Sequence, residues 1–475
     1  MKKIILIIIL LGVVLFGEDK NIKKALVKIY ASHQGHNYKS PWQVGEEYNS
    51  TSTGFIVENN QIITNAHSVL YAKFLQVRKE GDSKKYKANV KFISADYDLA
   101  IIDVEDKNFY KETKQLSLGK LPELQENVNV YGYPLGGDKL STTKGIVSRI
   151  EHNSYTLTNQ KYLIGQTDAA INSGNSGGPV ISKDKVVGVA FAGLKQADNI
   201  GYFIPVNVLK HFLNDVKDGK YDGSPSLGLG LVKLESIAYR KMLGLDNDSK
   251  GILVKEIYPN SPFEGVLQKN DVITKLDGKD IYYDGTIKFR KDEKTDLSYI
   301  NQQKNYGDEI SYEIVRNKEK KMGTVKLNSR NVRYSVVKNI PLENQPTYFV
   351  YGGLVFEPLT NNYLLLELDG ITLTNDTEDK YKNYDEMVLL VRVLPYDINI
   401  GYDEQENILI TKVNGEKYKN FKDFVDKVRN TKTEFIIFET EYNEEIVLDT
   451  KEVERQENEL MENYNIINEA SEDIK

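Results

Sequence analysis

Between residues 23 and 213 the chain is broken into many short runs of β-branched and aromatic residues. Gly, Asn and Asp residues, which accept the backbone angles of tight turns, separate these runs. Numerous short strands without a regular helical period are typical of a barrel or a sandwich. We therefore predict a mainly β fold for this part of the chain. The clearest runs span residues 25–30, 54–57, 127–133 and 185–190.

A helical pattern follows at residues 206–216, where apolar residues recur three and four positions apart. The next stretch, residues 218–226, is polar and contains two glycines and a proline, so we predict a linker there. At about 100–200 residues per domain, a chain of this length suggests about three domains.

Two stretches beyond the predicted linker resemble each other. Residues 271–280 and 407–416 each contain a strand-like run, an Asp-Gly or Asn-Gly pair, and a polar restart. Such pairs accept positive φ, which a two-residue hairpin turn requires. We interpret the stretches as a weak repeat marking two related domains, against the alternative that they coincide by chance. The apolar spacing after the second stretch predicts a helix over residues 421–428.

Composition excludes several kinds of chemistry. The chain has no cysteine, which excludes disulfides, thiol catalysis and thiolate metal sites. A net charge of −7 gives no indication of a nucleic-acid partner. His33 and His36 have a spacing that metal ligands can use, but no partner ligands stand out, so we predict a surface loop and no metal. Without a Walker-type phosphate loop, we expect no ATP coupling and no cofactor.

The N-terminus resembles an export signal. A basic head, Met1-Lys2-Lys3, precedes an apolar stretch over residues 4–16. This stretch is shorter than the roughly 20 apolar residues of a membrane span, and the combination is typical of a secretory signal peptide. We predict a signal peptide over residues 1–17. The alternatives are an uncleaved anchor, which would associate the protein with a membrane surface, and a buried strand.

The most specific motif is Gly174-Asn175-Ser176-Gly177-Gly178-Pro179. Glycines beside a serine let the backbone turn tightly and let a substrate carbonyl approach. We predict Ser176 as a nucleophile and the amides of Gly174 and Ser176 as oxyanion donors, of which one typically contributes about 3 kcal/mol. The alternative is an ordinary Gly-Ser loop, but this six-residue string is more specific than a bare Gly-x-Ser-x-Gly.

Acyl transfer by a serine also needs a base and a carboxylate that orients the base. His67, in Thr64-Asn65-Ala66-His67, follows a strand-like run and is the predicted base, because histidine titrates near neutrality. Asp98 opens an apolar run and is the predicted orienting acid. Composition alone leaves Asp96 and Asp103 open, and the short Asp-Leu-Ala run favours Asp98.

The order His67, Asp98, Ser176 is that of chymotrypsin-like proteases, and the strings around these residues resemble the Deg/HtrA branch. The resemblance covers nearly the whole mature chain. It implies a chymotrypsin-like double β-barrel protease domain followed by two PDZ-like α+β domains, acting as an ATP-independent serine endopeptidase on unfolded or damaged proteins. The strings are Thr64-Asn65-Ala66-His67, Asp98-Leu99-Ala100 and Thr167-Asp168-Ala169-Ala170-Ile171-Asn172-Ser173-Gly174-Asn175-Ser176-Gly177-Gly178-Pro179.

Further strings resemble the plant-type Deg subgroup, in which the second PDZ domain is divergent and serves assembly more than peptide capture. The resemblance implies a homo-oligomer, a trimer or a hexamer, that takes unfolded proteins and peptides as substrates. Plant members reside in organelles or the nucleus, whereas the signal sequence indicates the periplasm or cell envelope of a bacterium. The strings lie at residues 284–286, 289–290, 351–356 and 399–402.

The start of the first predicted PDZ domain contains a candidate peptide-binding loop, and the inferences together divide the chain into six segments. The string Pro225-Ser226-Leu227-Gly228-Leu229 resembles a PDZ carboxylate-binding loop, so the amides of Leu227, Gly228 and Leu229 are predicted to receive a peptide C-terminus. The alternative is an ordinary Gly-rich start of a strand. The segments are a signal peptide (1–17), a protease domain (18–217), a linker (218–226), a first PDZ domain (227–330), a divergent PDZ-like domain (331–450) and an acidic tail (451–475), which is either a solvated helix or a frayed end.

Two positions near Ser176 bear on activation and specificity. Digestive relatives carry Asp where this chain has Asn175, and that Asp pairs with a newly cut N-terminus. Asn cannot form that ion pair, so we predict activation through loops and assembly. Ala170 lies where an acid selects Lys or Arg in trypsin-like relatives. With Ala190, Phe191 and Ala192 opposite, it predicts an apolar pocket and cleavage after small or medium aliphatic residues.

Two other functions remain open on the sequence. One is a chaperone or scaffold in which peptide binding outweighs cleavage. The other is a pure PDZ interaction module, which leaves the protease-like half unexplained.

Overall fold

A computed structural model of the chain describes residues 21–134, 137–154, 161–193, 200–245, 250–329, 337, 340–368 and 383–475. The predicted signal peptide lies outside these residues. None of the described helices is long and apolar enough to cross a membrane. The chain forms two compact units, Met1–His33 with Tyr48–Arg333 and Gln34–Glu47 with Tyr334–Lys475. A short stretch near the N-terminus therefore belongs to the unit that contains the C-terminus.

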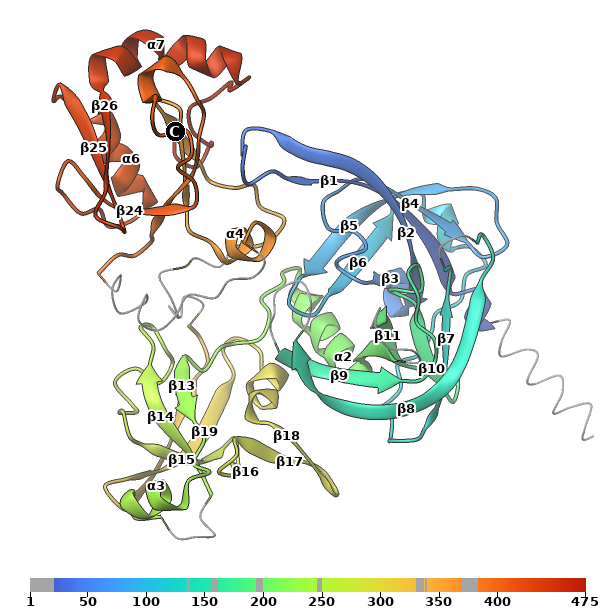
Figure 1. Cartoon of the computed structure of the whole chain (residues 1–475). Helices are drawn as coiled ribbons and strands as arrows, with labels where there is room; N and C mark the ends of the chain where they lie inside the picture. Colours follow the sequence, from blue (N-terminus) through green and yellow to red (C-terminus); the bar gives the residue numbers. More distant parts are fainter. Residues whose placement is uncertain are drawn as a thin grey trace, which may run out of the picture. The chain divides into compact units, whose positions relative to one another are not determined.

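Six strands near the N-terminus close into a barrel, in the order β1-β2-β3-β6-β5-β4 (Figure 1). Closure leaves no free sheet edge, and alternate residues point into the barrel and form its core. Ile29, Ile62 and Ile102 are completely buried members of this core. The strands are β1 (Leu26–His36), β2 (Val44–Val57), β3 (Gln61–Thr64), β4 (Ala72–Lys79), β5 (Tyr86–Ser94) and β6 (Leu99–Val104).

A second barrel follows in the order β10-β11-β12-β9-β8-β7, so the predicted double barrel is confirmed. The predicted helix is α2 (Val206–Asp215), which starts after Pro205 and buries Val208, Leu209 and Phe212 on one face. The strands are β7 (Asn127–Gly132), β8 (Ser141–Ser154), β9 (Lys161–Thr167), β10 (Pro179–Ser182), β11 (Lys185–Gly193) and β12 (Gly201–Pro205).

The segment predicted as a linker is packed against the protease half. The hydroxyls of Tyr221 and Ser94 are hydrogen-bonded at 2.6 Å, and those of Ser224 and Tyr97 are also bonded. The carboxylate of Asp215 accepts hydrogen bonds from two amides of the segment, at 3.0 and 2.8 Å. These residues therefore form an ordered connection.

The next domain contains a sheet in the order β13-β14-β15-β19-β20, with β16 paired to β15. A hairpin of β17 and β18 and the short helix α3 (Ile237–Met242) complete it. Its core is aliphatic around Phe263. The strands are β13 (Leu229–Val232), β14 (Ile252–Ile257), β15 (Val272–Leu276), β16 (Lys279–Asp280), β17 (Thr286–Arg290), β18 (Glu293–Asp296), β19 (Glu309–Arg316) and β20 (Glu319–Lys326).

The C-terminal domain has six antiparallel strands that neighbour one another in sequence order, β21 to β26. The predicted helix over 421–428 is α6 (Phe421–Arg429), and the Asn420 side chain caps it by accepting from the amide of Asp423. The other elements are β21 (Phe349–Tyr351), β22 (Leu354–Pro358), β23 (Val388–Val393), β24 (Ile408–Val413), β25 (Phe435–Thr440), β26 (Glu445–Asp449), α4 (Asn361–Leu366) and α7 (Thr450–Asn463).

The two predicted hairpin turns are confirmed. Asp277 and Gly278 follow β15 with φ of 48° and 71°, and Asn414 and Gly415 follow β24 with φ of 50° and 77°. Positive φ at both positions is the type I′ requirement. The first turn follows β15, the third strand after β13 and β14, and the second turn follows β24, the third strand after β22 and β23. The equivalent positions support the interpretation of the two stretches as a repeat.

The helix predicted as one form of the acidic tail is confirmed as α7, but the prediction that the tail is solvated is wrong. Val453 and Leu460, seven residues apart on one face of α7, are 1% and 0% exposed and belong to the core of the C-terminal domain. Further on, Ala470 joins the same core, and the carbonyl of Glu469 accepts from the amide of Val350 at 2.7 Å. The many glutamates of this segment lie mainly on its solvent-facing side, whereas most of its few apolar residues pack into the core.

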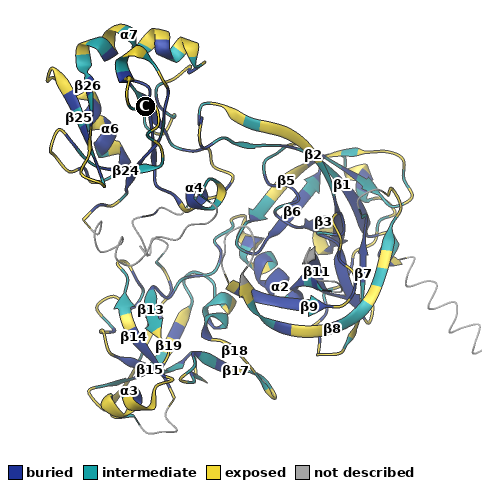
Figure 2. Cartoon of the chain, viewed as in Figure 1, coloured by how far each residue is buried: buried dark blue, intermediate teal, exposed yellow. Residues whose placement is uncertain are grey.

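The hairpin of β1 and β2 is longer than the barrel needs. Residues 44–51 of β2 are exposed or half-buried, and only residues 52–57 are buried (Figure 2). The predicted surface loop at His33 is wrong, because His33 is 1% exposed. Its Nδ1 is hydrogen-bonded to the carbonyl of Leu70 at 2.8 Å and its Nε2 to the Ser50 hydroxyl at 2.7 Å.

Candidate active site

The predicted base and acid lie at the ends of two neighbouring strands. His67 follows β3, and Asp98 directly precedes β6. Because β3 and β6 are antiparallel, with Thr64 opposite Ala100, the end of one strand and the start of the other meet at one edge of the barrel. Ser176 precedes β10 of the other barrel.

Asp98 is the carboxylate that the structure brings to His67. Its Oδ2 lies 2.7 Å from Nδ1 of His67, and its Oδ1 accepts from the His67 amide at 2.8 Å. Asp98 is completely buried and has a φ of 49°, which Asp tolerates better than most residues. The competitor Asp103 instead pairs with Lys107 at 3.0 Å.

The pKa of His67 reflects two opposed effects. Burial disfavours the charged imidazolium and lowers the pKa, whereas the charge of Asp98 and its hydrogen bond raise it. Burial is the largest single effect, but the two contributions of Asp98 together outweigh it, so the pKa of His67 lies above its ordinary value of 6.5. Asp98 therefore makes the imidazole a stronger proton acceptor and fixes its orientation.

The loop that carries Ser176 is held by Thr53 of β2. The Thr53 hydroxyl donates to the carbonyl of Gly174 at 2.7 Å and accepts from the amide of Tyr133 at 2.9 Å. The Thr53 amide donates to the carbonyl of Ser176 at 3.0 Å. Sequence reasoning missed Thr53, because nothing in its local sequence distinguishes it from any other threonine in a strand.

Gly177 and Gly178 are needed for close backbone packing. Gly177 has a φ of 81°, and a Cβ there would lie 2.2 Å from the carbonyl oxygen of Thr53. A Cβ at Gly178 would lie 2.0 Å from the carbonyl oxygen of Tyr131. Any other residue at either position would therefore push the loop of Ser176 away from β2 or from β7.

The amides of Gly174 and Ser176 stay predicted oxyanion donors. Gly174 has a φ of 95°, and within the described residues neither its amide nor that of Ser176 donates to a protein acceptor. The Ser176 hydroxyl donates to the carbonyl of Phe191 at 3.1 Å. In the predicted mechanism this proton has to leave the Phe191 carbonyl before it can pass to His67.

The predicted pocket residues have unequal positions. Ala170 is exposed, and its carbonyl accepts from the Thr143 hydroxyl at 2.9 Å. Ala190 is completely buried, and its backbone bonds to both Gly177 and Gly178. The Phe191 ring lies edge-on to His67 with centroids 6.4 Å apart. The side chain of Ala192 falls outside the described residues, and the pocket stays a prediction.

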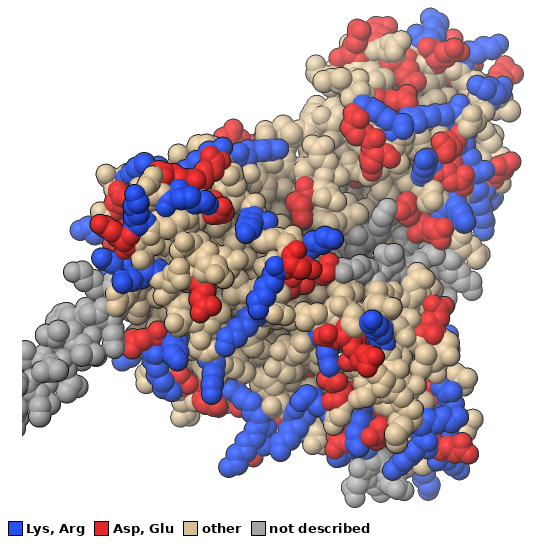
Figure 3. Space-filling model, turned by 180° about the vertical axis from the view of Figure 1, so that it is seen from behind, with Lys and Arg blue, Asp and Glu red and all other residues tan. Residues whose placement is uncertain are grey.

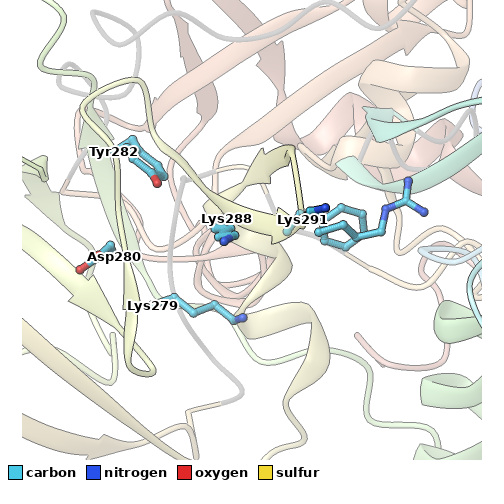
Figure 4. Close-up of a pocket in the computed structure, with 7 residues that line it drawn as sticks. Lys279, Asp280, Tyr282, Lys288 and Lys291 are labelled. Atoms are coloured by element: carbon cyan, nitrogen blue, oxygen red, sulfur yellow. The ribbon is translucent and has the colours of Figure 1, made fainter. Parts of the chain in front are cut away.

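On the face shown in Figure 3, Lys and Arg are interspersed with Asp and Glu. A hollow of about 520 Å³ lies on the domain after the barrels, and none of the predicted site residues line it (Figure 4). Asp280 in its wall pairs with Lys250, and Arg290 pairs with Glu293. The lining residues are Lys279, Asp280, Tyr282, Lys288, Phe289, Arg290 and Lys291.

Comparison with known proteins gives three domain matches and relatives along nearly the whole chain. A trypsin model matches residues 29–213, and two PDZ domain models match 225–327 and 337–473. Protease Do-like 2, chloroplastic, of Arabidopsis thaliana is 36% identical over 96% of this chain and 76% of its own length. The chain belongs to the Deg/HtrA family of serine proteases. The Deg/HtrA relatives also include the serine protease DegP homolog of Plasmodium falciparum, 31% identical over 87% of this chain and 59% of its own length.

Solved structures of Deg/HtrA proteases share the fold. The HtrA-type protease AlgW with decapeptide has a TM-score of 0.52 at 22% identity and covers 66% of this chain and 98% of its own. A second structure, of AlgW with tripeptide, has a TM-score of 0.53 at 23% identity and covers 66% of this chain and 97% of its own.

In the first PDZ domain, none of the described residues pairs with the outer side of β13, beside the predicted carboxylate loop. β13 ends its sheet, so an extended peptide can add to it. Gly228 has a φ of 64°, and a Cβ there would lie 2.6 Å from Ser261. The Gly228 amide donates to the Ser226 hydroxyl at 3.0 Å, so Ser226 has to turn away before this amide can receive a carboxylate. The carboxylate role of Leu227, Gly228 and Leu229 stays a prediction.

In the second PDZ domain the equivalent edge is filled. β22 takes the place of β13 in the strand order, and β21 pairs along its outer side. β21 is in turn bridged by the C-terminal segment, with Phe349 opposite Ala470. This domain's own chain therefore occupies the position where a peptide strand would add.

Proposed function

We propose that this Deg/HtrA protease is an ATP-independent endopeptidase that cleaves unfolded or damaged proteins through an acyl-enzyme. One observation carries the proposal: the buried Asp98 holds His67 at the barrel edge, where Thr53 holds the loop of Ser176. The Ser176 oxygen attacks the scissile carbonyl while Nε2 of His67 takes its proton. The same proton then passes to the leaving amine, and water hydrolyses the ester by the reverse steps.

The remaining parts of the site take supporting roles in this proposal. The amides of Gly174 and Ser176 stabilise the oxyanion, and Asp98 stabilises the imidazolium of His67. An apolar pocket that includes Ala170 and Phe191 favours cleavage after small or medium aliphatic residues. The first PDZ domain captures peptide C-termini, and the chain assembles as a trimer or a hexamer.

We further propose export to the cell envelope of a bacterium. The basic head and apolar stretch over residues 1–17 support export. Several relatives are named chloroplastic or mitochondrial, so the compartment needs a direct test. Cell fractionation with an antibody to the chain, with and without residues 1–17, would decide it. Recovery of both forms in the cytoplasm would contradict this proposal.

Digestion of casein by wild type and by Ser176→Ala tests the activity. Wild type should cut casein, and the variant should not, while both react equally with an antibody to the folded chain. The alternative, a chaperone or scaffold, predicts that neither cuts casein under conditions that permit assembly, while both suppress aggregation of unfolded casein. Equal cutting by both proteins would remove Ser176 from the mechanism.

A further inference from the structure

The tip of the β1–β2 hairpin, residues Gln34–Glu47, is part of the core of the second PDZ domain. Tyr38 in this tip is 1% exposed, and its ring lies edge-on to Tyr363 with centroids 6.1 Å apart. Burying a tyrosine and placing it edge-on to another ring each stabilise a contact. The tip is therefore anchored in the core of this domain through a buried side chain.

Two further contacts fix the tip within the same unit. The indole nitrogen of Trp42 donates to the carbonyl of Tyr464 at 3.2 Å, and its ring lies 6.1 Å from that of Tyr348. Nε2 of His36 is hydrogen-bonded to the carbonyl of Glu343 at 3.1 Å. The tip thus contacts the start of the domain, α4 and the segment that follows α7.

The middle of the hairpin is also locked, but to the protease barrel. Tyr48 stacks on His33 with ring centroids 4.7 Å apart and planes inclined by 11°. His33 is bonded to the carbonyl of Leu70 and to the hydroxyl of Ser50. Thr53 lies in β2, three residues after Ser50, and holds the loop of Ser176. The strand β2 therefore runs without interruption from the end of the tip, at Val44, through Tyr48 to Thr53, which contacts the loop of Ser176.

We propose that the second PDZ domain is a docking site for this hairpin tip, and that β2 transmits its seating to Thr53. Seating of the tip then favours the arrangement in which Gly174 and Ser176 direct their amides to a ligand. This inference rests on the proposed catalytic role of Ser176. It makes the second PDZ domain a regulatory support of the active site through an element of the protease itself.

The sequence supplies a reporter, because Trp42 is the only tryptophan of the chain. Its fluorescence reports the seating of the tip, and the rate at which a fluorophosphonate labels Ser176 reports the nucleophile loop. In Tyr38→Ala we expect the emission to shift to longer wavelength and the labelling to slow several-fold. Tyr38→Phe, which keeps the ring, should match wild type in both measurements.

A second variant separates transmission from seating and from folding. Two glycines inserted between Glu47 and Tyr48, where the two units join, should leave the emission of Trp42 unchanged and still slow the labelling of Ser176. An unchanged emission in Tyr38→Ala would overturn the docking site. Unchanged labelling in the insertion variant would overturn the transmission along β2. Failure of wild type to be labelled would instead refute the proposed function.

Discussion

The charge of Asp98 should be visible in the pH dependence of catalysis. General-base action requires neutral His67, and the pKa of His67 is raised above 6.5, so activity should rise with pH through a midpoint above 6.5. Asp98→Asn should lower kcat by about 10⁴-fold and move the midpoint to lower pH. The pH profile of kcat/KM on a peptide substrate measures both effects, and a midpoint that Asp98→Asn leaves in place would contradict this assignment.

Thr53 should act as a positioning residue. Thr53→Val keeps the shape of the side chain but removes the bond to Gly174 and leaves the Tyr133 amide without its acceptor, a loss of about 1–3 kcal/mol. We expect kcat to fall while KM stays unchanged. Thr53→Ser keeps the hydroxyl and is the matched control. Equal kcat values in the two variants would show that the hydroxyl has no role in positioning the loop.

The contrast between Thr53 and the motif residues shows what the sequence could predict. Ser176, His67 and Asp98 stand in strings whose residue types are tied to their chemistry, so they could be selected locally. Thr53 works through a contact with Gly174, 121 residues away, which depends on how the two barrels meet. Such long-range partners cannot be read from strand patterns.

Among the larger elements, α7 should make the stability of the second PDZ domain pH-dependent. Burial raises the pKa of Glu457 to about 7, with the bond from the Gly352 amide opposing and the charge of Glu469 adding to the effect. In the folded chain Glu457 therefore keeps a proton up to about pH 7, whereas in the unfolded chain it loses this proton near its ordinary pKa of 4.5. This contribution is complete below pH 4.5 and is lost as the pH rises to about 7.

Thermal unfolding between pH 4.5 and 7.5 measures this dependence. We expect Glu457→Gln, which keeps the hydrogen-bond acceptor, to have a flatter dependence of the unfolding temperature on pH than wild type. Glu462→Gln, farther along α7 at an exposed position, is the control and should follow wild type. Parallel curves for Glu457→Gln and wild type would contradict the raised pKa of Glu457.

The two PDZ domains should differ in peptide binding because their edge strands differ. A peptide with an apolar C-terminus should bind the first domain, where β13 is open, and not the second, where β21 covers β22. Gly228→Ala, whose Cβ would clash with Ser261, should weaken this binding, whereas Gly265→Ala, with open space around its Cβ and a comparable φ, controls for backbone strain. Calorimetric titration checks this, and unaltered affinity in Gly228→Ala would exclude the loop.

At this scale the sequence predicted the strands, the hairpin turns and α6, because turn residues and apolar spacing determine them locally. It did not predict that α7 and the segment after it complete the core of the second PDZ domain. Val453 and Leu460 are two apolar residues among many glutamates. Their burial depends on distant partners: Val453 lies close to Gly352, and Leu460 lies close to Gly353.

For the whole molecule, we expect activation by assembly and not by a cut. Asn175 is 2% exposed and carries no charge that a new N-terminus could neutralise. The mature chain should therefore digest casein without further nicking, and its activity per chain should fall when dilution dissociates the oligomer. Mass photometry beside a dilution series of activity measures this. Full activity of a monomer, or activity only after a downstream cut, would contradict this expectation.

The seated hairpin tip also decides which truncations of this protein can be useful. Removing the second PDZ domain would strip the cover from Tyr38 and Trp42 and leave a strand whose outer half has no partner domain. Exposed aromatic side chains at the tip of a long hairpin favour aggregation. Conversely, the C-terminal domain expressed alone would lack a part of its own core. A shortened protease should therefore lose the hairpin tip together with the domain, and a complete C-terminal domain would need residues 34–47 supplied as a separate peptide.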